Sequence, residues 1–187
     1  MTPPRRRLLV ALSVAAVAAA GVALMLGLRR PWAPGSAAWR AVDAQVRAAH
    51  PDVPLIGTDT LAAWLGQPGA PLLLDARTAR EYAVSHLPGA VRVDPDAPAE
   101  ALADTLAALR ADPSRPVVVY CSVGWRSAGV AERLRAAGAG DVRNLRGSIF
   151  RWASEGRPLV ADGHPASRVH PFDAVWGRLL PPDLRAE

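Results

Sequence analysis

A single cysteine stands at the end of an apolar run, five residues before an arginine. Residues 117–127 read VVVYCSVGWRS, and Cys121 is the only cysteine in the chain. A thiol between a strand and a helix meets unpaired backbone N–H groups and the positive end of the helix dipole, which together lower the thiol pKa. Arg126 can place a fixed positive charge at the mouth of the same loop. A cysteine at the end of an apolar strand is, by its position alone, more typical of a small buried core residue. The nearby glycine, arginine and serine favour a nucleophile instead.

The residues around Arg126 suit a loop that binds an anion. Gly124 allows the backbone to curl with its N–H groups pointing inward, and the Ser127 hydroxyl can brace the loop or the first helical turn. Trp125 either packs beneath the loop or shapes an apolar rim for a partner. We therefore expect an exposed thiolate with Cys121 and Arg126 as catalytic residues, in a substrate-binding loop formed by Ser122, Val123, Gly124, Trp125 and Ser127.

The composition excludes several kinds of site. One cysteine allows neither an internal disulfide nor a zinc site built on paired cysteines. The 22 basic residues, all arginine, alternate with 17 acidic ones to give a net charge of +5, so we expect a solvated surface and no nucleic-acid partner. His164 and His170 flank a loop but lack a third ligand. We expect no metal site.

The elements that must position the loop alternate between strands and helices. Continuous apolar runs at 71–76 and 116–121 predict strands covered on both faces, the second at the sheet centre, and shorter strands are expected at 53–57, after the loop 85–93, and at 141–145. Helices are expected at 36–49 with Ser36 as N-cap, 60–65 capped by Thr58 or Asp59, 78–84, 98–110, 126–137 ended by Gly138, and 148–156.

This alternation predicts the α/β class, with an open, mostly parallel sheet flanked by helices on both faces. Sites in such folds form at the carboxyl ends of the strands. Two of the expected strand ends carry reactive residues, namely Asp75 and Cys121.

Three stretches of the sequence are similar to signatures of the rhodanese-like sulfurtransferases. CSVGWRS at 121–127 resembles their active loop, a cysteine, four residues and an arginine, usually with a glycine inside. DARTAREYAVSHLPGA at 75–90 resembles a second signature, and NLRGSIFRW at 144–152 resembles the closing element. Together they span about 54–162. Ser148 stands where the family often has a second glycine, which affects a turn more than the chemistry.

The resemblance implies a persulfide mechanism in a rhodanese-like fold. A donor such as thiosulfate would give its outer sulfur to the Cys121 thiolate, and the persulfide would pass it to cyanide, a thiol or a protein. The loop N–H groups and Arg126 would stabilise the persulfide anion and the departing sulfite. The resemblance requires no metal or organic cofactor.

Four residues of the second signature are expected to support the loop. Asp75 is as well explained by a structural role, pairing with Arg77 or loop amides, as by a catalytic one. Arg77 and Glu81 are four apart and are expected to pair across one helical turn. His86 is expected to fix a turn rather than to move a proton.

The sequence also leaves two other functions open. Phosphatases that share this fold separate the cysteine from the arginine by five residues, and the four found here favour sulfur. A membrane-tethered sulfur carrier, or a redox-sensing binding module with little turnover, would have the same loop as an enzyme.

Residues 8–28 carry no charge and, as a helix, are long enough to cross a bilayer. We expect residues 1–35 to form a single-pass anchor and linker in the cytoplasmic (inner) membrane, with the catalytic domain on the extracytoplasmic side. A cleaved signal peptide with a secreted or periplasmic product is the alternative. Residues 36–165 are expected to form the rhodanese-like domain, and the amphipathic stretch within 166–187 is expected to dock on it.

Overall fold

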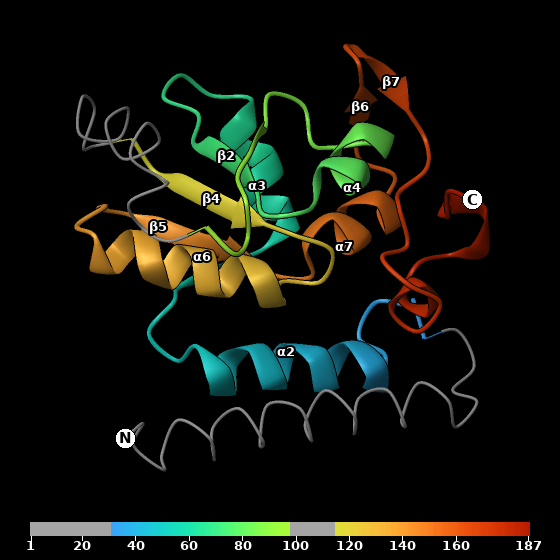
Figure 1. The fold of residues 1–187 in the computed structure, drawn as a ribbon, viewed down its shortest axis with the longest axis horizontal. Helices are drawn as coiled ribbons and strands as arrows, with labels where there is room; N and C mark the ends of the chain where they lie inside the picture. Colours follow the sequence, from blue (N-terminus) through green and yellow to red (C-terminus); the bar gives the residue numbers. More distant parts are fainter. Residues whose placement is uncertain (1–30, 98–114) are drawn as a thin grey trace.

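A parallel sheet forms the centre of the computed structural model, which describes residues 31–97 and 115–187 (Figure 1). In these residues the five strands run in the order β1-β5-β4-β2-β3. Their bounds are β1 Leu55–Ile56, β2 Leu72–Asp75, β3 Val91–Arg92, β4 Val117–Tyr120 and β5 Val142–Leu145. The prediction that the VVVY run lies at the sheet centre is therefore confirmed.

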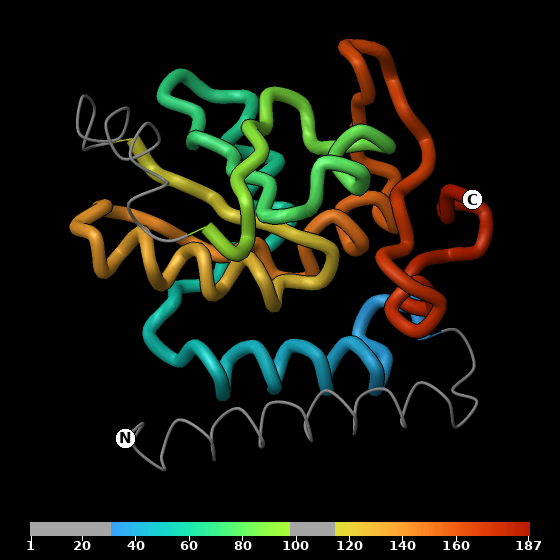
Figure 2. The backbone as a smooth tube through the Cα atoms, in the orientation of Figure 1, coloured from blue at the N-terminus to red at the C-terminus, as the bar shows by residue number. Residues whose placement is uncertain are grey.

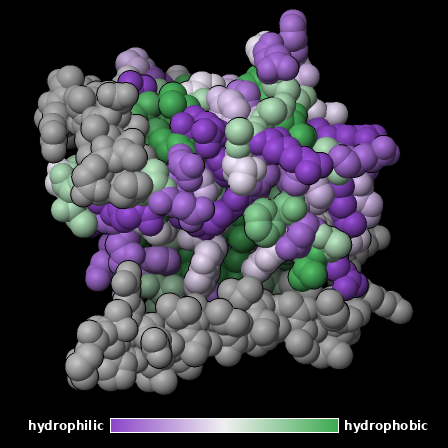
Figure 3. Space-filling view, viewed as in Figure 1, coloured by the Kyte–Doolittle hydropathy of each residue, from purple (hydrophilic) through white to green (hydrophobic). Residues whose placement is uncertain are grey.

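Helices flank this sheet, as the alternating pattern predicts. They are α2 Ala37–Ala49, α3 Thr58–Leu65, α4 Ala79–Val84, α6 Trp125–Ala136 and α7 Ser148–Ser154. A small antiparallel hairpin follows, with β6 Leu159–Ala161 and β7 His164–Ala166, and then two short 3-10 helices, η2 Trp176–Leu179 and η3 Pro182–Leu184. The hairpin was not predicted from the sequence. Its projecting end is hydrophilic (Figure 3).

The two faces of the sheet pack into separate apolar clusters because strand side chains alternate. Val119 and Cys121 lie in the cluster that includes Leu134 of α6. Val118 and Tyr120 lie in the other cluster, which includes residues of α2, α3 and α7. The Cys121 thiol therefore faces α6, the helix that follows its loop.

Most predicted helix ends are found close to their expected places. Ser36 caps α2, its hydroxyl accepting a hydrogen bond from the Trp39 N–H at 3.2 Å, and Gly138 has a left-handed φ of 89° after α6. The cap of α3 was predicted wrongly. Its N-cap is Gly57, without a side-chain hydrogen bond, because the helix already begins at Thr58.

Two predicted segments lie outside the described residues. They are the helix at 98–110 and the membrane anchor at 8–28. Over residues 31–97 and 115–187, no helix combines the length and apolar character needed to cross a membrane.

The C-terminal segment, residues 167–187, runs along the side of the domain near α7 (Figure 2). Its Val169, Leu179 and Leu180 are fully buried and belong to the same apolar cluster as α2 and α7. Backbone hydrogen bonds join Val169 to Leu184 and Ala186 to Val169. Burial of these side chains thus holds the segment on the domain, while the backbone hydrogen bonds join the two ends of the segment to each other.

Candidate active site

Cys121 directly follows β4 and begins the loop that leads into α6. Its Sγ accepts a hydrogen bond from the Gly124 N–H at 3.2 Å. The residue is only 1% exposed, so the expectation of an exposed thiolate is wrong. The loop folds over the sulfur where the chain reverses direction, between the end of β4 and the start of α6.

Gly124 makes this reversal possible. Its φ of 108° lies in the left-handed region that favours glycine. A Cβ there would come within 3.6 Å of both Asn144 Nδ2 and the Leu145 carbonyl oxygen. Any other residue at this position would therefore have a strained backbone, although its Cβ would make only ordinary van der Waals contacts.

Asn144 in β5 braces the loop from below. Its Nδ2 donates to the Gly124 carbonyl oxygen at 2.9 Å, and its Oδ1 accepts from the Ser127 hydroxyl at 2.7 Å. Asn144 is fully buried. Sequence reasoning overlooked it, although a polar side chain inside an expected buried strand is a signal that could have identified it.

The start of α7 holds the other side of the loop. The Ser148 hydroxyl accepts from the Cys121 N–H at 3.2 Å and donates to the Leu145 carbonyl oxygen at 3.1 Å. Ser148 has a positive φ of 49°, so it adopts the backbone conformation that a glycine would provide. Two α7 amides, those of Ile149 and Phe150, donate to the carbonyl oxygens of Cys121 and Ser122. Ser148 therefore contacts the backbone of Cys121 as well as shaping a turn.

Glu81 of α4 reaches the Cys121 loop from the opposite side. Arg126 donates from Nη1 and Nη2 to the two Glu81 carboxylate oxygens, at 2.8 and 2.7 Å. Ser122 donates its hydroxyl to Glu81 Oε1 at 3.0 Å and accepts from Arg126 Nη2 at 3.0 Å. The predicted pair between Arg77 and Glu81 is therefore wrong, because the Glu81 carboxylate faces the loop and binds Arg126.

Glu81 also closes the first turn of its own helix. It forms a capping box with Thr78, which donates to Glu81 Oε2 from both its N–H, at 3.0 Å, and its hydroxyl, at 2.9 Å. Burial raises the pKa of Glu81. The hydrogen bonds and charge of Arg126, together with the hydrogen bonds from Thr78, outweigh this effect and bring the pKa down to about 2. The carboxylate is thus ionised at neutral pH.

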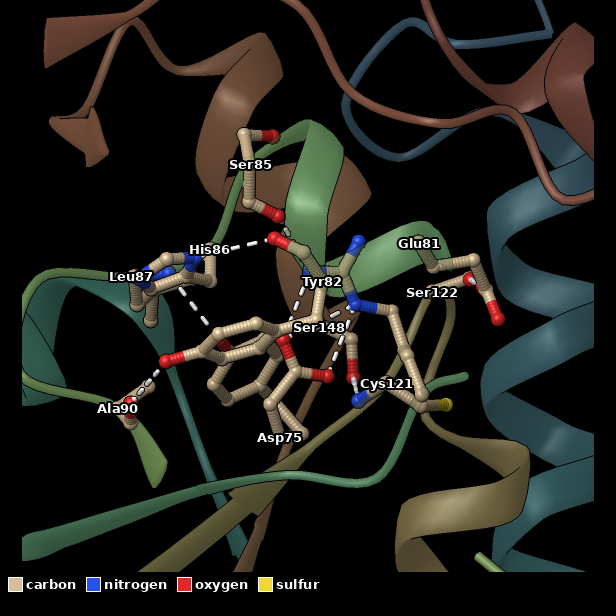
Figure 4. Close-up of polar contacts among 12 residues, drawn as sticks. Asp75, Glu81, Tyr82, Ser85, His86, Leu87, Ala90, Cys121, Ser122 and Ser148 are labelled. Carbon is tan, nitrogen blue, oxygen red and sulfur yellow. Dashed lines mark hydrogen bonds and ion pairs between the residues drawn. The ribbon is translucent and has the colours of Figure 1, made fainter. Parts of the chain in front are cut away.

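Asp75 and Arg77 form a separate buried pair at the end of β2. Arg77 donates to both Asp75 carboxylate oxygens, at 2.7–3.1 Å, and to the Ser85 carbonyl oxygen at 2.6 Å. Figure 4 shows the Cys121 sulfur pointing away from the Asp75 carboxylate. Asp75 therefore has a structural place beside the loop rather than against the thiol.

His86 lies on the far side of the Asp75 pair. Its Nδ1 is 3.0 Å from the Tyr82 carbonyl oxygen, and its ring stacks on the Tyr82 ring with centroids 3.8 Å apart. Its backbone pairs with Val160 of β6 through N–H to O contacts in both directions, each 2.9 Å. His86 thus connects α4 to the hairpin and does not touch Cys121.

The electrostatics of the loop favour a thiolate. Burial alone raises the pKa of the Cys121 thiol, but the charge of Arg126 and hydrogen bonds from Ser127 and Gly124 outweigh it, so the pKa lies below its usual value. Removing a proton from Cys121 therefore costs less here than in water, and the resulting anion has donors already directed at it.

A pocket of about 200 Å³ opens next to the thiol. Its floor consists of the loop residues Cys121, Ser122, Val123 and Arg126. Its walls are aromatic and consist of Trp125, Phe172 and Trp176. The predicted loop residues Gly124 and Ser127 do not line this pocket but support the loop from beneath. Phe172 and Trp176 were not identified from the sequence as site residues.

The described residues contain no group of three or more histidine, cysteine, aspartate or glutamate side chains that could hold a metal ion. His164 is exposed at the start of β7. His170 Nδ1 accepts a hydrogen bond from the Phe172 N–H at 3.0 Å, so its ring serves the backbone of the C-terminal segment.

Comparison with known proteins links this geometry to sulfur chemistry. A sulfurtransferase of Allochromatium vinosum is 35% identical over 106 residues, covering 57% of this chain and 94% of that protein. A tRNA uridine(34) hydroxylase of Sodalis glossinidius is 29% identical over 119 residues, covering 62% of this chain but only 33% of its own.

Solved structures share the fold as well. The thiosulfate sulfurtransferase of Pseudomonas aeruginosa aligns with a TM-score of 0.54 at 27% identity, over 75% of this chain and 26% of that one. Residues 58–155 match the family model of the rhodanese-like domain. These residues include the Cys121 loop, Glu81 and Asn144, and they make up just over half of the chain, which therefore belongs to the rhodanese-like domain family.

Proposed function

We propose that the protein moves sulfane sulfur from a thiosulfate-like donor to a thiophilic acceptor through a persulfide on Cys121. One observation carries this proposal, the contact of the Cys121 Sγ with the Gly124 N–H at 3.2 Å beside Arg126, whose charge lowers the thiol pKa. A thiolate held in this way is a nucleophile that can form and release a covalent intermediate. Membership of a family with sulfurtransferase relatives supports sulfur transfer in general.

The proposed reaction has two displacements. In the first, the Cys121 thiolate attacks the outer sulfur of thiosulfate, the S–S bond of the donor breaks, and sulfite leaves with the bonding electron pair. In the second, cyanide, a thiolate or a protein acceptor attacks the outer sulfur of the persulfide, and Cys121 leaves as a thiolate. Charge is conserved in both steps, and no external oxidant or reductant is needed.

Arg126 and the loop amides would stabilise the anions in these steps. The Gly124 N–H already points at the sulfur, at 3.2 Å. Arg126 is fixed by Glu81 and Ser122 through hydrogen bonds of 2.7–3.0 Å, so little reorganisation is needed when negative charge develops. Glu81 offsets part of the Arg126 charge, and its role in the proposal is to position the guanidinium.

Intact mass spectrometry tests the proposal. Full-length protein in a mild detergent is exposed to thiosulfate, and we expect the mass of one added sulfur on the wild type and none on Cys121→Ser. Cyanide should remove the added sulfur and form thiocyanate. Fast loading with very slow transfer to cyanide would instead indicate a sulfur carrier whose acceptor is another protein.

Several sulfur donors should be compared in the same experiment. An unmodified wild-type protein with every donor would reject the persulfide mechanism. Hydrolysis of an aryl phosphate without any sulfur loading would assign a phosphatase instead.

We also propose that residues 8–28 anchor the protein in the cytoplasmic (inner) membrane, with residues 36–165 as the catalytic domain and 166–187 as its docked tail. The support is the length of this uncharged segment and the arginines at both of its ends. The catalytic domain would lie on the extracytoplasmic side. A C-terminal reporter active only in the cytoplasm would overturn this orientation, and recovery of a shortened chain in the soluble fraction would indicate a cleaved signal peptide.

A further inference from the structure

The C-terminal segment contributes a wall of the pocket above Cys121. Phe172 and Trp176 line this pocket together with Trp125 of the loop. Both lie beyond residues 58–155, the part of the chain that matches the family model. The wall is therefore a feature of this chain that the family match does not account for.

The wall is held in place by its own hydrogen bonds. The Phe172 N–H donates to His170 Nδ1 at 3.0 Å, and Asp173 Oδ1 accepts from the N–H groups of Val175 and Trp176, each at 2.8 Å. Trp176 begins the 3-10 helix η2, and the last residue of this helix, Leu179, is buried in the core and anchors it there. Phe172 has a positive φ of 67°, a strained conformation for an aromatic residue that this network sustains.

Phe172 covers the cation of the site. The guanidinium carbon of Arg126 lies 4.8 Å from the centroid of the Phe172 ring. The same guanidinium is paired with the ionised Glu81 carboxylate. Arg126 therefore presents a charge to the pocket that is already partly compensated, and a doubly charged inorganic anion would gain less from it than from a free arginine.

The remaining surface of the pocket favours an apolar group. Three aromatic side chains form its walls, and burying an apolar ring against them is favourable in proportion to the area removed from water. The volume is about 200 Å³, and a cavity of roughly 150 Å³ suffices to hold benzene. The space fits one ring or a short apolar chain beside the thiol.

From this we infer that the pocket selects an organic sulfur donor with an aromatic or short apolar group next to the transferred sulfur, such as an aryl thiosulfonate, and that Phe172 and Trp176 determine this specificity. The inference rests on the proposed sulfur transfer through Cys121. The thiolate attacks the outer sulfur of the thiosulfonate, the S–S bond breaks, and an aryl sulfinate leaves with the electron pair. One negative charge enters with each reactant and leaves with each product.

Two donors with the same reacting group separate the contribution of the ring. Persulfide formation on the full-length protein is measured with benzenethiosulfonate and with methanethiosulfonate, and each rate is divided by the rate of that donor with free cysteine in solution. For the wild type, we expect the corrected kcat/KM to favour the benzene compound by about tenfold or more. Phe172→Ala and Trp176→Ala should each lower this preference at least threefold, on the order of what a lost apolar contact is worth.

Val91→Ala is the matched control, because Val91 is a 51% exposed apolar side chain that does not line the pocket. It should keep the wild-type preference. Phe172 is itself 44% exposed, so Phe172→Ala is expected to fold even if Trp176→Ala does not. A wild-type protein without preference for the benzene compound, or a preference unchanged in Phe172→Ala, would overturn the inference.

A binding measurement distinguishes this result from failure of the sulfur transfer itself. Cys121→Ser cannot form a persulfide, but its pocket walls are intact. Its tryptophan fluorescence is titrated with benzenesulfinate and methanesulfinate, the products of the two donors. Tighter binding of benzenesulfinate that weakens in the Cys121→Ser, Phe172→Ala double variant supports the specificity even if no donor loads sulfur on the wild type. Equal binding of both sulfinates would contradict it.

Discussion

Replacing Glu81 by glutamine removes the charge that holds Arg126 while keeping the shape of the side chain. Glu81 is 2% exposed and binds Arg126, Ser122 and Thr78 through its two oxygens. Glutamine can still accept a hydrogen bond from Thr78 or Arg126 with one oxygen. The substitution therefore tests the charge of the network more than its packing.

The pKa of Glu81 sets the expected magnitude. It falls from an ordinary value of 4.5 to about 2, and each pKa unit is worth about 1.4 kcal/mol, so the ionised carboxylate contributes about 3 kcal/mol to the free energy of unfolding at neutral pH. Loss of one partner from a buried ion pair costs a similar amount, about 3–5 kcal/mol. We expect Glu81→Gln to lower the free energy of unfolding by about 3 kcal/mol at pH 7.

The pH dependence of this loss follows from the direction of the shift. Because the folded-state pKa lies below the unfolded one, the contribution of Glu81 is complete above about pH 4.5 and is lost as the pH falls toward about 2. The difference in unfolding free energy between wild type and Glu81→Gln should thus narrow to about 1.5 kcal/mol at pH 3.

Urea unfolding of both proteins at several pH values, in the same detergent, measures this difference. Asp59→Asn is the control, because the Asp59 side chain is 96% exposed and its pair with Arg157 lies at the surface, where such pairs contribute little. A loss below about 1 kcal/mol at pH 7, or a loss that does not change between pH 7 and pH 3, would show that the charge of Glu81 does not stabilise the fold.

Two further substitutions test the loop itself. Arg126→Ala should raise the apparent pKa of Cys121, measured from the pH dependence of its alkylation, because the positive charge that lowers the pKa is removed; an unchanged pKa would mean that the amides and Ser127 suffice. Asn144→Ala leaves the Ser127 hydroxyl and the Gly124 carbonyl without their partner. We therefore expect a loss of about 2–4 kcal/mol in the free energy of unfolding, together with slower persulfide formation. The same loss of stability with an unchanged rate would limit Asn144 to a structural role.

Local patterns in the sequence were enough for much of the fold. Continuous apolar runs identified β2 and β4, because strands covered on both faces need no polar alternation. Ser36 and Gly138 marked helix ends through backbone hydrogen bonding and a left-handed conformation, both properties of a few adjacent residues. The β6–β7 hairpin was not predicted, because each of its strands has only three residues, too few to show an alternating pattern.

The Cys121 loop could be predicted from the sequence, because the spacing of Cys121, Gly124 and Arg126 along one strand, turn and helix depends only on nearby residues. The contacts around this loop could not, because they come from elements far apart in the chain. Glu81 rather than Arg77 meets the loop, and Phe172 crosses over Arg126 from a segment far along the chain. Such contacts depend on how distant elements pack, which no local pattern encodes, and that packing also buries the thiol that the sequence had placed at the surface.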